Sequence, residues 1–184
     1  FAFYDTGHWG VTGGGTGTSG ATAALGGKLV QTTNNVDNDW QANYLTPATF
    51  AFAAGQDVWY GLNFQLSTVS GATSCDFIAG MMDAWNDITP TDGVWFNKPQ
   101  NSTTLSLKIT ASGTSTTIAV GTVAANTAYT VGFYYNGSAG TPTLYVFSTI
   151  PYGAGTLTKP TPYWPGGNLM ALPQRNVKKT YRII

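Results

Sequence analysis

The side chains most capable of chemistry in this sequence are few and scattered. The chain has one histidine, His8, one cysteine, Cys75, and eight acidic residues, all of them aspartate. His8 lies beside an aromatic residue in a glycine-rich stretch, and no G-x-S-x-G motif for a nucleophilic serine occurs. Cys75 precedes an apolar segment, a position typical of a small packed residue rather than of a nucleophile. We therefore expect a protein that is not an enzyme.

Four aspartates between residues 76 and 92 form the main acidic cluster. Two carboxylates can hydrolyse a glycoside if one has a raised pKa, and several together can bind calcium. The cluster lacks the D-x-[DN]-x-[DN]-G spacing with a final glutamate that marks a calcium loop. We expect Asp87 and Asp92 instead to shape turns around Pro90 and Gly93, with no metal and no cofactor. The four aspartates are Asp76, Asp83, Asp87 and Asp92.

The overall composition narrows the functional class. Of the 184 residues, 9% are charged and 42% are hydrophobic, and the formal net charge is zero. A neutral chain has no broad field to attract nucleic acid or an anionic membrane, so neither is an expected partner. A single cysteine and an N-terminus unlike a signal peptide predict synthesis in a reducing cytosol.

The elements that must position any site are predicted to be strands. In "VWYGLNFQL", Tyr60, Leu62 and Phe64 alternate with Trp59 and other residues on the opposite face. The same period recurs in "TLSLKIT" and "TTIAVGTV", and "AYTVGFYYNG" with "TPTLYVFST" predicts a hairpin. Strands separated by short Gly, Asn and Ser turns predict an all-β sandwich of two antiparallel sheets.

The stretch "GMMDAWNDITPTDGVWFNK" is the densest in Asp, Trp and Met. We interpret residues 77–82 as a core strand, residues 83–91 as a loop, and residues 94–96 as the next strand. The stretch is therefore expected to connect two strands rather than to perform chemistry.

The expected organisation is one sandwich domain spanning residues 1–184. A glycine-rich N-terminal arm with the first strand covers residues 1–28, and its stretch "TGGGTGTSGATAALGG" is expected to be flexible or irregular. The sandwich core covers residues 29–150, and a proline-rich C-terminal arm with the last strand covers residues 151–184. The arm around Tyr163 and Trp164 is apolar, so it should pack on its own domain or on a neighbour.

Six tryptophans and ten tyrosines make the aromatic residues the main candidates for recognition. Flat rings stack on pyranose faces, so a sugar-binding groove is one interpretation, with Trp85 and Trp95 as the contacts. Trp59 faces opposite to its apolar neighbours, so it is either on an exposed sheet face or covered by an arm or partner. The expected interface residues are Trp9, Trp40, Trp59, Tyr163 and Trp164.

A series of motifs resembles a known family. In order, these are "FYDTGHW", "DNDWQANY", "FAFAAGQDVWYGLNFQLS", "FIAGMMD", "DGVWFNK", "LSLKIT", "NTAYTVGFYYNG" and "LYVFST". The series is similar to tailed-bacteriophage virion proteins with a concanavalin-like or laminin-G-like jelly roll. The match runs from about residue 3 to residue 147 and consists of fold-level patterns without a catalytic signature.

The resemblance implies a capsid decoration (cement) protein on the outer surface of the phage head. Such a protein binds the major capsid protein and stabilises contacts between capsomers, and a homotrimer is the commonest arrangement implied. The alternative that stays open is a carbohydrate-binding, lectin-like module, on a virion appendage or free, with a host-surface glycan as its ligand.

Overall fold

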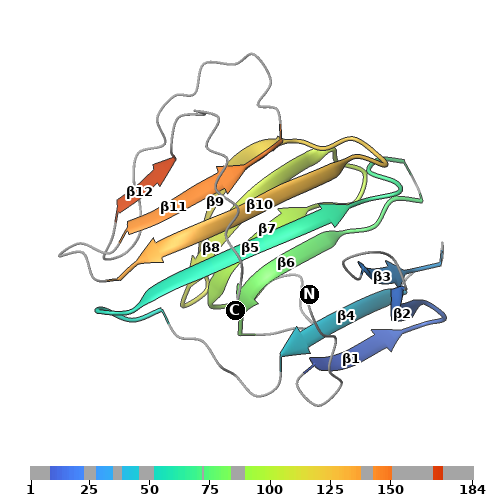
Figure 1. Cartoon of the computed structure of the whole chain (residues 1–184), viewed down its shortest axis with the longest axis horizontal. Helices are drawn as coiled ribbons and strands as arrows, with labels where there is room; N and C mark the ends of the chain where they lie inside the picture. Colours follow the sequence, from blue (N-terminus) through green and yellow to red (C-terminus); the bar gives the residue numbers. More distant parts are fainter. Residues whose placement is uncertain are drawn as a thin grey trace. The chain divides into compact units, whose positions relative to one another are not determined.

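A computed structural model of the chain describes residues 9–22, 28–34, 39–45, 52–71, 73–83, 90–137, 143–150 and 168–171. All regular structure within these ranges is β-strand (Figure 1), so the all-β prediction is confirmed. The described part of the chain contains no helix with the length and apolar character needed to span a membrane. The chain forms two compact units: Phe1–Phe50 with Ala84–Ile88, and Ala51–Asp83 with Thr89–Ile184.

The second unit contains two four-stranded sheets. Sheet I has the strand order β12-β11-β10-β5 and sheet II the order β6-β7-β8-β9. All described strand pairs are antiparallel except β11 with β12. Sheet I comprises β5 (Asp57–Gln65), β10 (Ala128–Asn136), β11 (Thr143–Ser148) and β12 (Asn168–Ala171). Sheet II comprises β6 (Phe77–Met82), β7 (Gly93–Lys98), β8 (Thr104–Ala111) and β9 (Thr114–Thr122).

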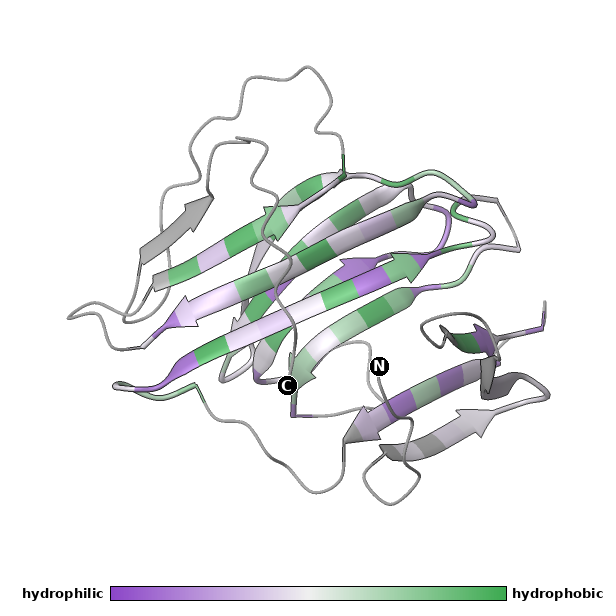
Figure 2. Cartoon of the chain, in the orientation of Figure 1, coloured by the Kyte–Doolittle hydropathy of each residue, from purple (hydrophilic) through white to green (hydrophobic). Residues whose placement is uncertain are grey.

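The two sheets pack as a β-sandwich because each presents one apolar face to the other. Phe96 on β7 and Phe133 on β10 have ring centroids 6.4 Å apart, and Phe64 on β5 stacks on Phe77 of β6 at 4.7 Å. Apolar and polar bands alternate along several of these strands (Figure 2). The buried core residues are Val69, Val94, Phe96, Leu105, Leu107, Ile109, Val120, Val123, Tyr129, Val131, Phe133, Tyr135, Leu144 and Ile150.

The connections between the strands explain how the sandwich closes. Strands β6 to β9 follow one another as a meander in sheet II, while β5 and β10 are neighbours in sheet I. The β8–β9 turn places Ser112 and Gly113 at φ values of 49° and 77°, as a two-residue type I′ turn requires. The antiparallel sandwich is confirmed, whereas the jelly-roll and concanavalin-like character stays a prediction.

The strand predictions agree closely with the described elements. The residues predicted as strand, loop and strand between 77 and 96 are β6, the connection after Met82, and β7, which pair directly with each other. The predicted hairpin is β10 with β11. On β5, Val58, Tyr60, Leu62 and Phe64 pack against the core, as the alternation predicts.

The first unit contains two strand pairs, β1 (Trp9–Gly14) with β4 (Trp40–Leu45), and β2 (Thr18–Thr22) with β3 (Lys28–Thr32). We expected the glycine-rich stretch from Thr12 onwards to be irregular, and that expectation was wrong for residues 12–14 and 18–22. Long side chains on the paired strand occupy the space that β1 leaves empty: the Trp40 ring lies over Gly14 and the Tyr44 ring over Gly10.

Candidate functional site

The most distinctive surface feature of the second unit is a row of three aromatic side chains across sheet I. Trp59 on β5 is the direct register partner of Tyr134 on β10, and Tyr134 is the direct partner of Tyr145 on β11. Directly paired residues lie on the same face of a sheet, and this face is opposite to the one that carries Tyr60 and Phe133 into the core. We call these three residues the aromatic row and this side the outer face of sheet I.

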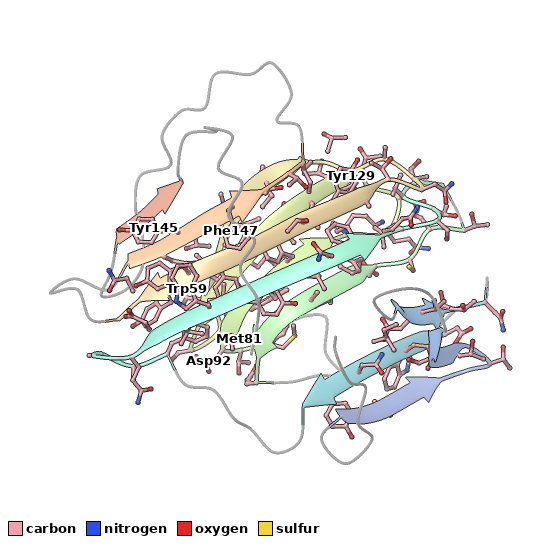
Figure 3. All side chains as sticks on the ribbon, in the orientation of Figure 1. Trp59, Met81, Asp92, Tyr129, Tyr145 and Phe147 are labelled. Carbon is pink, nitrogen blue, oxygen red and sulfur yellow. The ribbon has the colours of Figure 1, made fainter. Side chains whose placement is uncertain are left out.

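The rings of the aromatic row are stacked against one another. The centroids of Trp59 and Tyr134 are 3.7 Å apart with 16° between the ring planes, and those of Tyr134 and Tyr145 are 5.8 Å apart with 17°. Because neighbouring strands are about 4.8 Å apart, rings that stack across strands have their planes perpendicular to the line joining the strands. The row therefore presents ring edges outward. Figure 3 shows Trp59 and Tyr145 towards the same end of the sheet, with Tyr129 towards the other.

Polar groups flank the aromatic row on both sides. The Tyr134 hydroxyl donates a hydrogen bond of 2.8 Å to the Asp57 carboxylate. Burial, followed by the bond to Asp57, raises the pKa of Tyr134, so the phenol remains a neutral donor at physiological pH. Further along the same face, the Thr130 hydroxyl donates to the side-chain oxygen of Asn63 at 2.6 Å. The outer face thus combines apolar rings with oxygen acceptors held in place.

Between the Tyr134–Asp57 and Thr130–Asn63 hydrogen bonds, Phe147 on β11 covers Gly132 on β10. The two are direct register partners, and a Cβ on Gly132 would collide with the Phe147 ring and with the Tyr60 carbonyl oxygen. Glycine is required here because the ring occupies the space of a side chain. The outer face therefore carries four aromatic residues on three adjacent strands.

The predicted interface residues fall in different places. Trp59 is 43% exposed on the outer face of sheet I. This agrees with the first of its two predicted positions, an exposed sheet face. Trp40 is 37% exposed on β4 of the first unit. The backbone of Trp9 begins β1, but its side chain is outside the described part, as are Tyr163 and Trp164. The site prediction as a whole therefore stays a prediction, with Trp59 its best-placed member.

Of the two predicted sugar contacts, Trp95 lies within the described residues. Trp95 alternates with Val94 and Phe96 on β7, so it points away from the sandwich interior, yet it is only 1% exposed. Its ring is buried and presents no face to a ligand, which corrects the expectation for this residue. Trp85 lies outside the described residues.

The described aspartates of the acidic cluster organise loops. Asp83 accepts a hydrogen bond of 2.6 Å from the Thr91 hydroxyl, and this bond is the main reason that the pKa of Asp83 is lowered. Asp92 accepts from the Ser112 amide at 2.8 Å, so it braces the β8–β9 turn rather than its own turn. Asp76 accepts from the Gln100 amide. His8 and Asp87 lie outside the described residues, within which no group of three or more potential metal ligands occurs.

A buried lysine was not anticipated from the sequence. The Lys98 side chain at the end of β7 is fully buried, and its Nζ donates to the backbone oxygens of Val69, Pro99 and Ser102 at 3.1, 3.0 and 3.3 Å. Burial lowers the pKa of Lys98. Cys75, which follows Val69 by six residues in the chain, is exposed. The arrangement uses all three ammonium protons to tie loops together, so its role is structural.

Sequence reasoning singled out Trp59 but missed the other members of the outer face: Tyr134, Tyr145, Phe147 and Asp57. The alternation in the β10 and β11 sequences contained the signal, because Tyr134 and Tyr145 occupy positions opposite to the core residues. Alternation does not report which residues of two strands lie opposite each other, and it is this register that places the two rings beside Trp59.

We compared the chain with known proteins by sequence and by structure. No protein-family model, curated protein or solved structure gave a significant match. The surface chemistry of sheet I and the motif resemblance are therefore the grounds for a function.

Proposed function

We propose that this protein is a non-enzymatic virion structural protein that decorates the outer surface of a phage head and stabilises contacts between capsomers. The major capsid protein would be its partner, and self-association, with a trimer as the implied form, would accompany binding. The order of sequence motifs supports the virion class, and the β-sandwich provides a rigid scaffold for a binding surface.

The observation that carries this proposal is the aromatic outer face of sheet I. Trp59 is 43% exposed although it stacks on Tyr134, and Tyr145 extends the row. Trp and Tyr are enriched in protein interfaces because they bury a large area and lose little conformational entropy. Stacked rings on a sheet are also held rigid before binding, which reduces the entropy cost of association. We therefore place the contact with the capsid at this face.

Carbohydrate binding is the second candidate, favoured by the hydrogen-bonding groups of Asp57, Asn63 and Thr130 beside the aromatic row. Pyranose recognition uses ring faces, however, and the row presents ring edges outward. The two end faces of the row, on Trp59 and on Tyr145, are the ring faces not stacked within it. Edge contacts and hydroxyl groups suit a protein partner better, so we rank capsid binding first.

The first test is the copy number of this chain per purified particle, measured by quantitative mass spectrometry against the major shell protein. Hundreds of copies in a simple ratio to the shell protein would support decoration. A handful would indicate a tail or fibre module instead, and the absence of the chain would overturn the virion proposal.

The second test locates the contact. Trp59→Ala should weaken binding of the purified protein to undecorated particles by roughly fivefold to thirtyfold, as loss of an interface hot spot does. Thr117→Ala on the exposed edge of sheet II is the matched control and should leave occupancy unchanged. Equal occupancy for all three proteins would exclude the aromatic row as the capsid contact. Glycan-array binding that Trp59→Ala abolishes would favour the carbohydrate candidate.

A further inference from the structure

Trp59 is the exposed large hydrophobic residue among the described residues of the second unit, with 43% of its surface accessible. An exposed indole is one of the side chains that dissolved one-electron oxidants attack first. One face of this indole is covered by the phenol ring of Tyr134. Oxidation of Trp59 therefore takes place in direct contact with a second ring that is able to give up an electron.

The stack of Trp59 on Tyr134 gives an electron a short path between the two rings. The ring centroids are 3.7 Å apart and the planes are 16° from parallel, so the rings are in van der Waals contact. Direct pairing of the two residues in the β5–β10 ladder holds this contact in place. Tyr134 is half-buried and is stacked on its other side by Tyr145. A dissolved oxidant therefore reaches Trp59 more readily than Tyr134.

The hydroxyl group of Tyr134 has a proton acceptor in position. It donates a hydrogen bond of 2.8 Å to the carboxylate of Asp57, within the range at which a positioned base takes a proton. Tyrosine is a neutral phenol at physiological pH. Loss of an electron alone would leave a positive charge on a ring that water only partly solvates, which is costly. With Asp57 in contact, Tyr134 is able to lose the electron and the proton together.

Elsewhere in the described part of the second unit, these three elements are separated. Trp95 is 1% exposed, so its ring is shielded from a dissolved oxidant. The Tyr129 hydroxyl accepts a hydrogen bond from the Ala124 amide, and the Tyr129 ring is tilted by 40° against Phe64. The described residues thus bring an exposed indole, a stacked phenol and a carboxylate together at Trp59.

We propose that Trp59, Tyr134 and Asp57 form a one-electron relay that moves oxidation from the exposed indole to the phenol. A dissolved oxidant, such as the carbonate radical anion, takes one electron from Trp59 and becomes carbonate. The indole radical cation takes one electron from Tyr134, and the phenol proton passes to the Asp57 carboxylate. A hydrogen-atom donor in solution, such as ascorbate, then restores Tyr134, and Asp57 releases its proton to water.

The proton transfer sets the direction of the relay. Once the proton of Tyr134 is on Asp57, the phenoxyl radical is neutral and the indole has recovered its electron. Return of the electron to Tyr134 from Trp59 would then require the proton to move back as well. Trp59 is restored before water or oxygen adds to its ring. The relay therefore preserves the exposed tryptophan of the outer face.

This inference goes beyond the proposed function and does not depend on it. Each step takes place within one chain in solution and requires neither a capsid nor a glycan. Experiments on the purified chain therefore test the relay, while the copy number per particle tests decoration.

Time-resolved absorption after pulse radiolysis in bicarbonate buffer tests the electron transfer. The pulse produces carbonate radical anions, and indole and phenoxyl radicals have separate absorption bands. We expect part of the indole signal of the wild type to decay as a phenoxyl signal rises. Tyr134→Phe keeps a stacked ring but removes the phenol, so it should abolish this coupled change, whereas the matched control Tyr145→Phe should retain it. A coupled change that persists in Tyr134→Phe would overturn the proposal.

Asp57→Asn tests the proton acceptor. The amide is close in size to the carboxylate but is a far weaker base, so the coupled rise of the phenoxyl signal should slow by roughly a hundredfold. Transfer at the wild-type rate in this variant would overturn the role of Asp57 and with it the relay.

Mass spectrometry of the oxidised peptides shows where the damage remains. Trp40, which is 37% exposed in the first unit, is the internal reference for Trp59 in the same sample. Tyr134→Phe should raise the oxidation of Trp59 relative to Trp40 several-fold, because the indole radical is no longer repaired. Far-UV circular dichroism confirms that the variant is folded. An unchanged ratio of the two tryptophans in the folded variant would overturn the proposal.

Discussion

The indole of Trp59 lies face to face with the phenol of Tyr134, with their centroids 3.7 Å apart. The contact follows from backbone pairing, because the two residues are direct partners in the β5–β10 ladder. It joins an exposed ring to a neutral tyrosine that is itself held by Asp57. The same contact that supports the edge of sheet I therefore organises the surface that we assign to binding.

A double-mutant cycle measures this stack. Trp59→Ala and Tyr134→Ala should each reduce the free energy of unfolding, and the coupling energy between them should be about 0.5–1.5 kcal/mol, as for other aromatic pairs. Urea denaturation followed by far-UV circular dichroism gives the four values. Tyr134→Phe is the matched control, since it removes the bond to Asp57 but keeps the ring, and it should retain the coupling. Strictly additive losses would show that the rings do not stabilise each other.

Gly132 should tolerate no larger residue while Phe147 is present. Gly132→Ala introduces a methyl group into space occupied by the Phe147 ring and the Tyr60 carbonyl, so we expect a loss of roughly 1–3 kcal/mol in stability. Adding Phe147→Ala should make the effect of Gly132→Ala smaller, because the ring is then absent. Thermal denaturation of Gly132→Ala, Phe147→Ala and the double variant tests this. If Gly132→Ala costs as much stability in the Phe147→Ala background as in the wild type, the contact with the Tyr60 carbonyl alone causes the loss.

Lys98 should be essential to stability although it is a cation in the interior. Lys98→Met retains the aliphatic volume but leaves the three backbone oxygens without their donor, so we expect a loss of roughly 2–5 kcal/mol in the free energy of unfolding. Lys108→Met on the neighbouring strand β8 is only partly buried and should change stability by less than about 0.5 kcal/mol. Chemical denaturation of both variants decides the matter, and similar values for the two would refute a structural role of Lys98.

Stability should fall at alkaline pH because of Tyr60. Burial raises the pKa of this phenol well above its ordinary value of 10.0, so the native state keeps a proton that the unfolded state loses. The unfolded state then binds fewer protons, and the free energy of unfolding decreases as pH rises above about 10. Tyr60→Phe removes the titrating group and should show a shallower decline. Parallel slopes for the two proteins in urea titrations at several alkaline pH values would contradict this assignment.

Much of the fold was predictable because alternation in sequence reports which face of a strand is buried. Tyr60, Leu62 and Phe64 showed the inner face of β5 in this way, and residues 77–82 and 94–96 were recognised as strands from their apolar runs. A first strand was expected within residues 1–28, but the glycine-rich stretch itself was expected to be irregular. Gly10 and Gly14 of β1 are covered by Tyr44 and Trp40, which lie far along the chain on the paired strand β4.

The sequence by itself determined the all-β class, the inward residues of the central strands and the outward position of Trp59, because these depend on a local period of two residues. Only the tertiary structure decided that Trp59 stacks on Tyr134, that Trp95 is buried despite its outward position on β7, and that Lys98 finds three oxygens. Each of these depends on register and packing between segments distant in the chain. A shift of β5 by one residue along β10 would separate Trp59 from Tyr134, although the alternation in the amino-acid sequence would be the same.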